Sequence, residues 1–429
     1  MKSLFRVAGG IVHLSPVLSA VRNARVADPE TATVSEPRDV LIREGRITEV
    51  APAGTAGTED DTLDAGGRTV LPGLIDAHVH VTASTADLAT LGDTSPFLVA
   101  AQAQRLLNGM LARGFTTVRD AAGADHGIAE AVRRDLFVGP RLFFGGKALS
   151  QTGGHGDVRG PGTQVLDQHV CCPHLGIVCD GVSEVRRAAR DQLRTGADHI
   201  KIMLSGGVAS PTDRIDSTQF SDDEVRAIVE EAEAADRYVL GHAYTARAVD
   251  RGLRLGVRSI EHGNLIDSGS VALFREHDAF LVPTLVTYDR LKAEGARHGL
   301  PVASQLKIDQ VLAGGLDALR LATEGGVNVV FGTDLLGEMQ SHQSAEFRIR
   351  AQVVSSADVL RSATTTAARL LRAEGELGVV APGAHADLVV VDGDPLDDVT
   401  VLADPAHALH TVVKGGRPVV DDAGLVRTG

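Results

Sequence analysis

Two histidines separated by one residue follow an apolar stretch in the segment LPGLIDAHVH, residues 71–80. Side chains on a β-strand alternate between its two faces, so His78 and His80 point the same way and Val79 points oppositely. Imidazole is the commonest metal ligand of proteins, and two rings on one face can share a divalent ion. A hydrogen-bonded histidine pair at a strand end is the alternative. The pair therefore predicts a metal site if further ligands follow downstream.

Four such side chains follow, each at the end of an apolar stretch: Lys201 in HIKIMLSGG, His242 in LGHAY, His262 in SIEHG and Asp334 in FGTD. Lys201 lies between two isoleucines that face the other way, so its amine points inward, where burial favours the neutral, nucleophilic form. Taken singly, an ion-paired lysine, a core histidine and a helix N-cap are ordinary alternatives. Taken together, the four predict a shared site if their strands end at one place.

The chain after Leu71 alternates apolar strands with helical stretches, the pattern of parallel βαβ units. Eight strands are predicted, at residues 71–81, 116–120, 141–148, 199–204, 238–242, 259–262, 280–285 and 328–333. Helices are predicted at residues 96–113, 183–195 and 221–235, the last with a capping box of Ser221 and Glu224. This pattern predicts an α/β fold with a (β/α)8 TIM barrel, in which all strand C-termini face one mouth.

Both ends of the chain have short alternating β-patterns separated by Gly, Pro and acidic turns. Neither end has enough strands for a core of its own, so we expect the two to pair. The predicted domains are a β-sandwich built from residues 1–68 and 375–429, and a hydrolase barrel at residues 69–374. Residues 27–37 are predicted to form a surface loop or hairpin tip.

The composition excludes several classes of protein. Of 429 residues, 43% are hydrophobic and 3% aromatic, with no Trp, so aliphatic side chains must fill the core. The formal net charge of −14 argues against a nucleic-acid partner, which requires a basic footprint. No stretch approaches the ~20 apolar residues of a membrane helix, and residues 1–20 resemble a strand more than a signal peptide. We therefore expect a soluble, cytoplasmic protein without membrane contact.

The strand-end ligands resemble those of the amidohydrolase superfamily, and the leading PGLIDAHVH is typical of it. The resemblance extends over nearly the whole chain and implies a binuclear metal centre. It implies that His78, His80 and Asp334 bind one ion, that His242 and His262 bind the other, and that carboxylated Lys201 bridges the two ions, usually zinc. A carbamate explains the lysine, because it offers two oxygens and a negative charge where an ammonium has only donors.

In such a centre Asp334 is expected to be the base that takes a proton from a metal-bridging hydroxide. His155, in the Gly-rich loop GGHGD after strand three, is expected to donate a hydrogen bond to the substrate carbonyl oxygen; a surface histidine is the alternative. Tyr244 is expected on the inward face with His242, either to hold the substrate carboxylate or to pack above the metal. Arg214 in SPTDRID is a candidate for gripping that carboxylate, or an exposed loop arginine.

The phrases GGHGD, VASPTD and GHAYT and residues 179–207 resemble a branch that contains imidazolonepropionase, Xaa-Pro and Xaa-Arg or Xaa-Lys dipeptidases, and ochratoxin-type amidases. That branch implies hydrolysis of an amide next to a free carboxylate, in a dipeptide or an N-acyl amino acid. Two alternatives stay open: a cyclic-amide hydrolase such as imidazolonepropionase, and a non-catalytic scaffold with an amidohydrolase-like barrel. Homo-oligomers are common in the family, so we expect one here.

Two further groups have structural interpretations. Cys171, Cys172, His174 and Cys179 form a cluster without the paired CxxC spacing of zinc sites, so a structural loop is predicted and a local disulfide stays open. Arg119 and Asp120 end predicted strand two and are expected to form an ion pair inside the barrel or to support the site residues.

Overall fold

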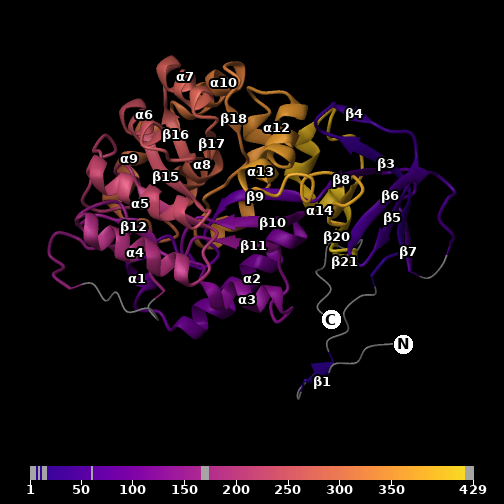
Figure 1. Cartoon of the computed structure of the whole chain (residues 1–429), viewed down its shortest axis with the longest axis horizontal. Coiled ribbons are helices and arrows are strands. Elements are labelled where there is room, and N and C mark those ends of the chain that lie inside the picture. The colour runs from indigo at the N-terminus through magenta and orange to yellow at the C-terminus, as the bar shows by residue number, and fades with distance from the viewer. Residues whose placement is uncertain (1–5, 8–9, 12–16, 59–60, 166–172, 421–429) are drawn as a thin grey trace.

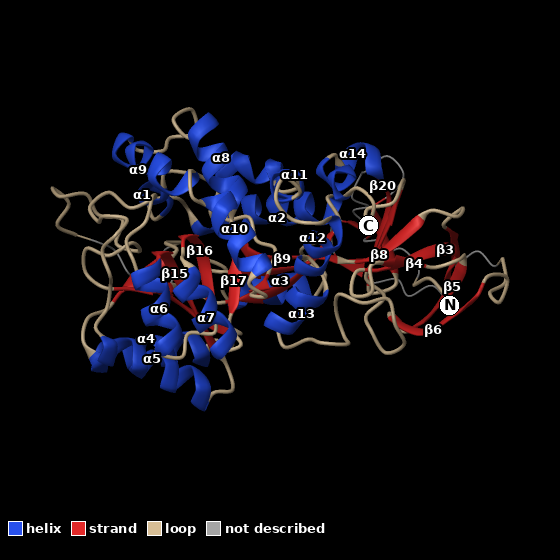
Figure 2. Ribbon diagram, turned by 90° about the horizontal axis from the view of Figure 1, so that it is seen from above, coloured by secondary structure: helices blue, strands red, loops and turns tan. Residues whose placement is uncertain are grey.

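The computed structural model describes residues 6–7, 10–11, 17–58, 61–165 and 173–420. Its larger part contains two parallel sheets surrounded by helices (Figures 1 and 2). The first sheet has the order β11-β10-β9 and the second the order β13-β12-β14-β15-β16-β17-β18. Parallel strands enclosed by helices confirm the predicted α/β class.

The bounds of these strands are β9 Leu74–Val79, β10 Phe115–Asp120, β11 Arg141–Phe144, β12 Ala148–Ser150, β13 Gly176–Val178, β14 His199–Met203, β15 Tyr238–Thr245, β16 Ser259–Leu265, β17 Phe280–Val282 and β18 Asn328–Val329. The helices between and after them are α1 Leu88–Leu91, α2 Pro96–Ala112, α3 His126–Arg133, α4 Val182–Arg194, α5 Asp222–Ala234, α6 Ala246–Arg254, α7 Ser268–Glu276, α8 Leu285–Glu294, α9 Val302–Leu312, α10 Gly315–Glu324, α11 Ala345–Arg350, α12 Ser356–Ser362 and α13 Thr365–Leu370. The predicted capping box is present at α5, where Ser221 and Glu224 bond each other's backbone N–H groups.

The predicted strands differ from the structure most clearly at three places. The predicted strand 71–81 is broken at Gly73, where a Cβ would lie 2.0 Å from Thr116 Oγ1, and its first part joins another sheet. The predicted strand 141–148 is divided into β11 and β12, with Gly146 between them at a φ of +70°. Only residues 328–329 of the predicted last strand form a strand, although Val330 N still bonds Leu281 O and Ala77 N bonds Phe331 O, both at 2.8 Å.

A further sheet joins the two ends of the chain. It has the order β21-β20-β19-β8-β3-β5-β6, with β4 and β7 also paired to β3. Its strands are β3 Ala20–Asp28, β4 Thr33–Val34, β5 Arg38–Arg43, β6 Arg46–Pro52, β7 Thr62–Asp64, β8 Thr69–Pro72, β19 Leu388–Val391, β20 Leu409–Lys414 and β21 Arg417–Val420, and the short helix α14 Pro405–Ala408 precedes β20. Antiparallel pairing of β8 with β19 connects the early strands to the yellow C-terminal segment (Figure 1). The expected pairing of the chain ends is present, whereas the β-sandwich architecture and the exact domain boundaries stay predictions.

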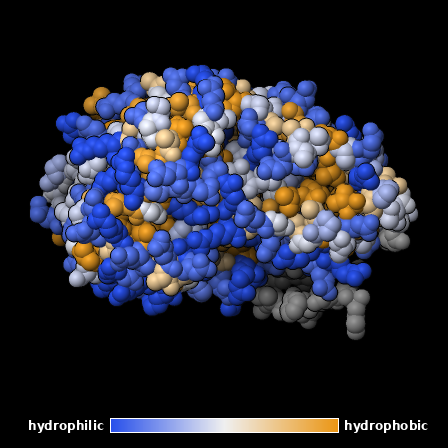
Figure 3. All heavy atoms as spheres, turned by 45° about the horizontal axis from the view of Figure 1, so that its top comes forward, coloured by the Kyte–Doolittle hydropathy of each residue, from blue (hydrophilic) through white to orange (hydrophobic). Residues whose placement is uncertain are grey.

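The core explains why Lys201 faces inward. Ile200 and Ile202 are fully buried and pack with Val185 of α4 and Val225 of α5 on the outer face of β14. Because strand side chains alternate, Lys201 lies on the opposite face. The outer surface is largely hydrophilic on the side seen in Figure 3, with smaller apolar patches. No helix within the described residues is long and apolar enough to cross a bilayer.

Candidate active site

Three of the predicted metal ligands converge at the carboxyl end of β9. The Nε2 atoms of His78 and His80 lie 3.4 and 3.0 Å from the same carboxylate oxygen, Oδ1 of Asp334. One ligand atom from each of these residues lies within 4.8 Å of the others. His78 is in β9, His80 directly follows it, and Asp334 follows the segment that pairs with β9, because Asp334 N bonds His78 O at 2.8 Å.

The hydrogen bonds of the two rings show which nitrogens are available for a metal. His78 Nδ1 lies 2.6 Å from a Glu261 carboxylate oxygen, and His80 Nδ1 lies 2.7 Å from the carbonyl oxygen of Ala122. Both partners accept hydrogen bonds, so each Nδ1 carries a proton and Nε2 is the nitrogen that faces Asp334. A divalent cation that displaced any proton from these two Nε2 atoms would find two imidazole nitrogens and an anionic oxygen of Asp334 as ligands.

The electrostatics around His78, His80 and Asp334 also favour a positive charge between these side chains. Burial lowers the pKa of His80, but the hydrogen bond and charge of Asp334 outweigh it, and the pKa is raised overall. Burial raises the pKa of Asp334, yet the neighbouring histidines hold that pKa well below its usual range. Asp334 is therefore an anion at neutral pH, as a metal ligand must be.

The other two predicted histidine ligands are His262, which lies next to His78, and His242, which lies next to His262. The ring centroids of His78 and His262 are 5.2 Å apart, and those of His242 and His262 are 4.5 Å apart. His242 Nε2 donates to the carbonyl oxygen of Gly206 at 3.2 Å, which leaves the Nδ1 lone pair available. Burial lowers the pKa of both His242 and His262 well below the usual range, so both rings are neutral, the form that binds metals.

Lys201 is the sixth member of the group. Its side chain is buried on the inner face of β14, and burial lowers its pKa to about 8, while the carboxylates of Glu261 and Asp334 act in the opposite sense. No hydrogen-bond acceptor within the described part of the chain lies at its amine. A buried amine with a depressed pKa is suited to react with carbon dioxide, because only the neutral form has a lone pair.

The backbone is unusual at two of the predicted ligands. His262 has a φ of +76° and Asp334 a φ of +53°, in the left-handed region that residues other than glycine seldom adopt. In β16 the positive φ of His262 breaks the regular alternation of side chains. Glu261 and His262, which are neighbours in sequence, can therefore both serve the same site. Such local strain is characteristic of functional positions.

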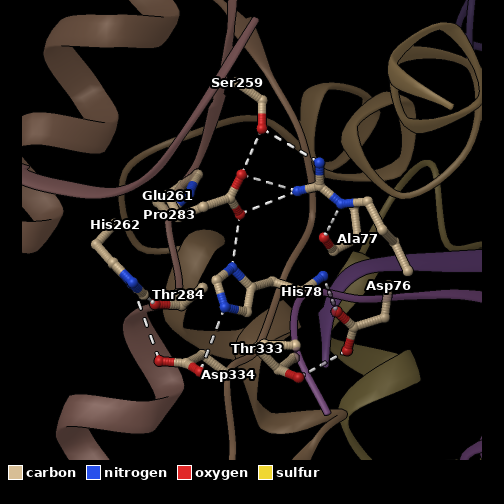
Figure 4. A network of polar contacts seen from close by, with 12 residues as sticks. Asp76, Ala77, His78, Ser259, Glu261, His262, Pro283, Thr284, Thr333 and Asp334 are labelled. Carbon is tan, nitrogen blue, oxygen red and sulfur yellow. Dashed lines mark hydrogen bonds and ion pairs between the residues drawn. The ribbon is translucent and has the colours of Figure 1, made fainter. Parts of the chain in front are cut away.

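Glu261 is the functional residue that the motifs did not predict. It accepts a hydrogen bond from His78, receives two from Arg119 Nη2 at 2.9 and 3.0 Å, and bonds the hydroxyl of Ser259 (Figure 4). Glu261 and Arg119 are both fully buried. Arg119 thus forms a buried ion pair with Glu261, the structural role favoured by the sequence, and the same carboxylate accepts from His78. Asp120 instead accepts the backbone N–H groups of Val81 and Ala124.

The predicted substrate-binding residues fall into two groups. His155 and Tyr244 both lie against His242, with ring centroids 4.1 and 4.8 Å away, and Tyr244 accepts a hydrogen bond from the Tyr288 hydroxyl at 3.1 Å. β15 extends to Thr245, so the expected placement of Tyr244 on the inward face is met. Arg214 is not brought to the site, since its side chain is 81% exposed and forms an ion pair with Asp216 at 2.8 Å.

Only part of the predicted cysteine cluster lies within the described residues. Cys171 and Cys172 lie outside the described residues, so the proposed local disulfide stays a prediction. Cys179 is a buried free thiol whose pKa burial raises to about 12, so it is not reactive at neutral pH.

The geometry places side chains that could hold a cation at the strand ends of a parallel α/β fold, and comparison with known proteins identifies the family. Residues 69–418 match the amidohydrolase family. The chain is 32% identical over 365 residues to ochratoxinase of Aspergillus niger, a match that covers 81% of this chain and 75% of that enzyme. The chain belongs to the amidohydrolase family, which confirms the resemblance seen in its motifs.

Solved structures of similar proteins match this chain over nearly its whole length. A prolidase complexed with N-methylphosphonate-L-proline matches with a TM-score of 0.91 at 49% identity, covering 93% of this chain and 98% of that one. A Xaa-Pro dipeptidase with methionine bound in its active site matches with a TM-score of 0.82 at 28% identity, covering 96% and 99%. Imidazolonepropionase of Micrococcus luteus is a more distant relative, 26% identical over 435 residues, which cover 94% of this chain and 96% of that enzyme.

Proposed function

We propose that this protein is a metal-dependent amidohydrolase that cleaves the amide bond of a dipeptide or an N-acyl amino acid, as a dipeptidase or carboxypeptidase-like enzyme. The observation that carries the proposal is the convergence of two imidazole nitrogens, Nε2 of His78 and of His80, on one carboxylate oxygen of Asp334. The prolidase and ochratoxinase relatives support hydrolysis of a C–N bond.

The donor set suits two divalent ions, which we propose to be zinc. His78, His80 and Asp334 would hold one, His242 and His262 the other, and a carboxylated Lys201 both. When bound, such ions polarise a carbonyl group and acidify a water molecule. Asp334 would hold the proton released from that water at its carboxylate and pass it to the leaving nitrogen.

Other residues would bind and orient the substrate. Tyr244 would hold the substrate carboxylate with its hydroxyl, and His155, stacked on His242, would contact the scissile amide. Arg214 is a weaker candidate, because reaching the mouth would require it to leave Asp216. The expected homo-oligomer and cytoplasmic location stay predictions.

We also propose that the two parallel sheets close into one eight-stranded barrel, in which β11 and β12 together make the third strand and β13 stays outside as an extra edge strand. β11 and β12 belong to different sheets but are joined by residues 145–147 alone. At the other side, the bond from Ala77 N to Phe331 O connects β9 with the segment that follows β18. Closure would bring the five strand ends that carry the six proposed ligands to a single mouth.

A panel of substrates tests the function. Metal-loaded protein should hydrolyse dipeptides or N-acyl amino acids and leave an imidazolone intact. The imidazolonepropionase alternative uses one metal ion and needs no bridging lysine, so the presence of Lys201 favours the dipeptidase-like function. Turnover of the imidazolone alone would favour that alternative. Absence of all hydrolysis, with substoichiometric metal after purification without chelator, would favour the scaffold.

A further inference from the structure

Asp213, on the loop after β14, is the centre of a buried polar cluster beside the site. Its side chain is 4% exposed and pairs with Lys307 Nζ of α9 at 3.2 Å. It accepts hydrogen bonds from Gln219 Nε2 at 2.9 Å and from the Gly207 N–H at 3.2 Å, and one from the Ser210 hydroxyl. Lys307 also donates to the carbonyl oxygens of Gly207 and Ser210 at 2.9 and 2.8 Å, so α9 fixes the whole loop.

Two of these partners lead directly to His155. Ser210 Oγ lies 2.8 Å from His155 Nδ1, and Gln219 Oε1 accepts the His155 backbone N–H at 2.9 Å. Asp213 therefore reaches both the ring and the backbone of His155 through one intervening side chain each. His155 and Asp213 come from different strand-end loops, so this contact joins two sides of the mouth.

The chemistry of the groups sets the direction of each hydrogen bond. A carboxylate only accepts, so Ser210 donates its single hydroxyl hydrogen to Asp213; the alternative acceptor, the Gly207 carbonyl oxygen, is 3.2 Å away and would use the same hydrogen. The Ser210 oxygen must then accept from His155 Nδ1–H. A neutral imidazole has one N–H, which leaves a lone pair on His155 Nε2.

The ring is also fixed sterically. It stacks on His242 with planes 29° apart, and a Cβ at Gly207 would lie 2.0 Å from His155 Cε1. Gly207 therefore makes room for the ring at this position. Among the residues that the structure describes, none bonds His155 Nε2, so this atom is left for a ligand.

We infer that Asp213 is a positioning residue which, through Ser210 and Gln219, holds His155 in the Nδ1–H tautomer and presents Nε2 as a hydrogen-bond acceptor at the mouth. Lys307 keeps the Asp213 carboxylate in place. A neutral His155 so held accepts a hydrogen bond from an N–H group of the substrate, in contrast to the donation to a carbonyl oxygen expected from the sequence. The kinetic consequence depends on the proposed function, whereas the tautomer does not.

The tautomer is measured by two-bond 15N–1H correlation spectra of the zinc-loaded protein labelled with 15N-histidine. The His155 signals are identified as those that His155→Gln removes. We expect the Nδ1–H pattern in the unmodified protein, and a shift toward the Nε2–H pattern in Ser210→Ala and Asp213→Asn. Ser210→Thr, which keeps a hydroxyl, should restore the first pattern. An Nε2–H tautomer in the unmodified protein would overturn the inference, whatever the substrate is.

Kinetics then test whether the positioning matters for turnover. Ser210→Ala and Asp213→Asn should lower kcat about tenfold or more, with a smaller change in KM and unchanged zinc content. Asp216→Asn is the matched control, since Asp216 is a 60% exposed carboxylate on the same loop that pairs with Arg214. An equal loss in this control, or full activity in both cluster variants, would contradict a specific role for Asp213.

Discussion

His78 is held in place by a chain of hydrogen bonds that the proposed metal site would need. Its Nδ1–H is fixed by Glu261, which Arg119 neutralises, so the ring cannot rotate and Nε2 faces Asp334. A carboxylate behind a metal-ligating histidine fixes the tautomer and raises the basicity of the ligand. The pKa of Glu261 is correspondingly low: burial raises it, but Arg119 and His78 bring it to well below its usual range.

Glu261→Gln should therefore weaken zinc binding about 10- to 100-fold with little change in fold. The amide keeps the size of the carboxylate but offers a neutral acceptor, and it leaves the buried Arg119 without its counter-charge. The measurement is a competition titration with a chromogenic chelator. Glu338→Gln, at a 73% exposed carboxylate, is the control. Unchanged affinity would mean that Glu261 has only a packing role.

Lys201→Ala should lose both metal and hydrolysis, because it removes the expected bridge between the ions. A short carboxylic acid added to the variant should restore part of both, since its two oxygens replace those of the carbamate. Lys292→Ala is the matched control, because Lys292 is half-exposed and pairs with Asp309 on the surface. Wild-type activity in Lys201→Ala would exclude the bridge.

The pKa of Lys201 also predicts a pH dependence for assembly of the site. With a pKa of about 8 in the metal-free protein, the amine is mostly charged at pH 7 and mostly neutral at pH 9. Only the neutral amine combines with carbon dioxide, so zinc and bicarbonate should reactivate metal-free protein faster as pH rises through 8. Recovery of activity over time measures this. A rate that is independent of pH between 7 and 9 contradicts it.

At the scale of strands and helices, hydrophobic alternation predicted which face each ligand occupies but not where strands are interrupted. The spacing of His78 and His80, the flanking isoleucines of Lys201 and the offset of Tyr244 from His242 all follow from a period of two, and the structure agrees. Glu261 was missed because regular alternation places it opposite His262. The positive φ of His262, which the alternation of polar and apolar residues does not reveal, brings both to the site.

Close approach of strands at the ligand positions also depends on tertiary contacts. A Cβ at Gly332 would lie 2.5 Å from Val282 Cγ1 and 2.9 Å from His78 Cβ, so β9 and the segment after β18 require glycine there. Gly332→Ala should displace His78 and weaken zinc binding, and should cost about 1–3 kcal/mol of stability. Metal titration and thermal melting measure both effects. Gly160→Ala, with nothing within 4 Å of its Cβ, is the control; equal behaviour of the two variants would contradict the steric account.

At the scale of the whole molecule, the sequence indicated that both chain ends are β-rich and that neither has enough strands for a sheet domain of its own. The antiparallel pairing of β8 with β19 connects the two ends in one sheet. β8 runs through Gly73 directly into β9, so the terminal sheet and the strand that carries His78 are one continuous piece of chain. The position of the break could not be predicted, because it depends on the contact of Gly73 with Thr116 and Asp387. The order of strands around the site followed from the βαβ pattern alone.

The most direct test is to measure metal content and amide hydrolysis on the same preparations. Protein purified without chelator, or reloaded with zinc and bicarbonate, should contain close to two divalent ions per chain. Its hydrolysis of a dipeptide or an N-acyl amino acid should fall in proportion as the ions are withdrawn, and return when they are restored. Hydrolysis that persists in fully stripped protein, or two bound ions per chain with no cleavage of any amide in the panel, would contradict the account.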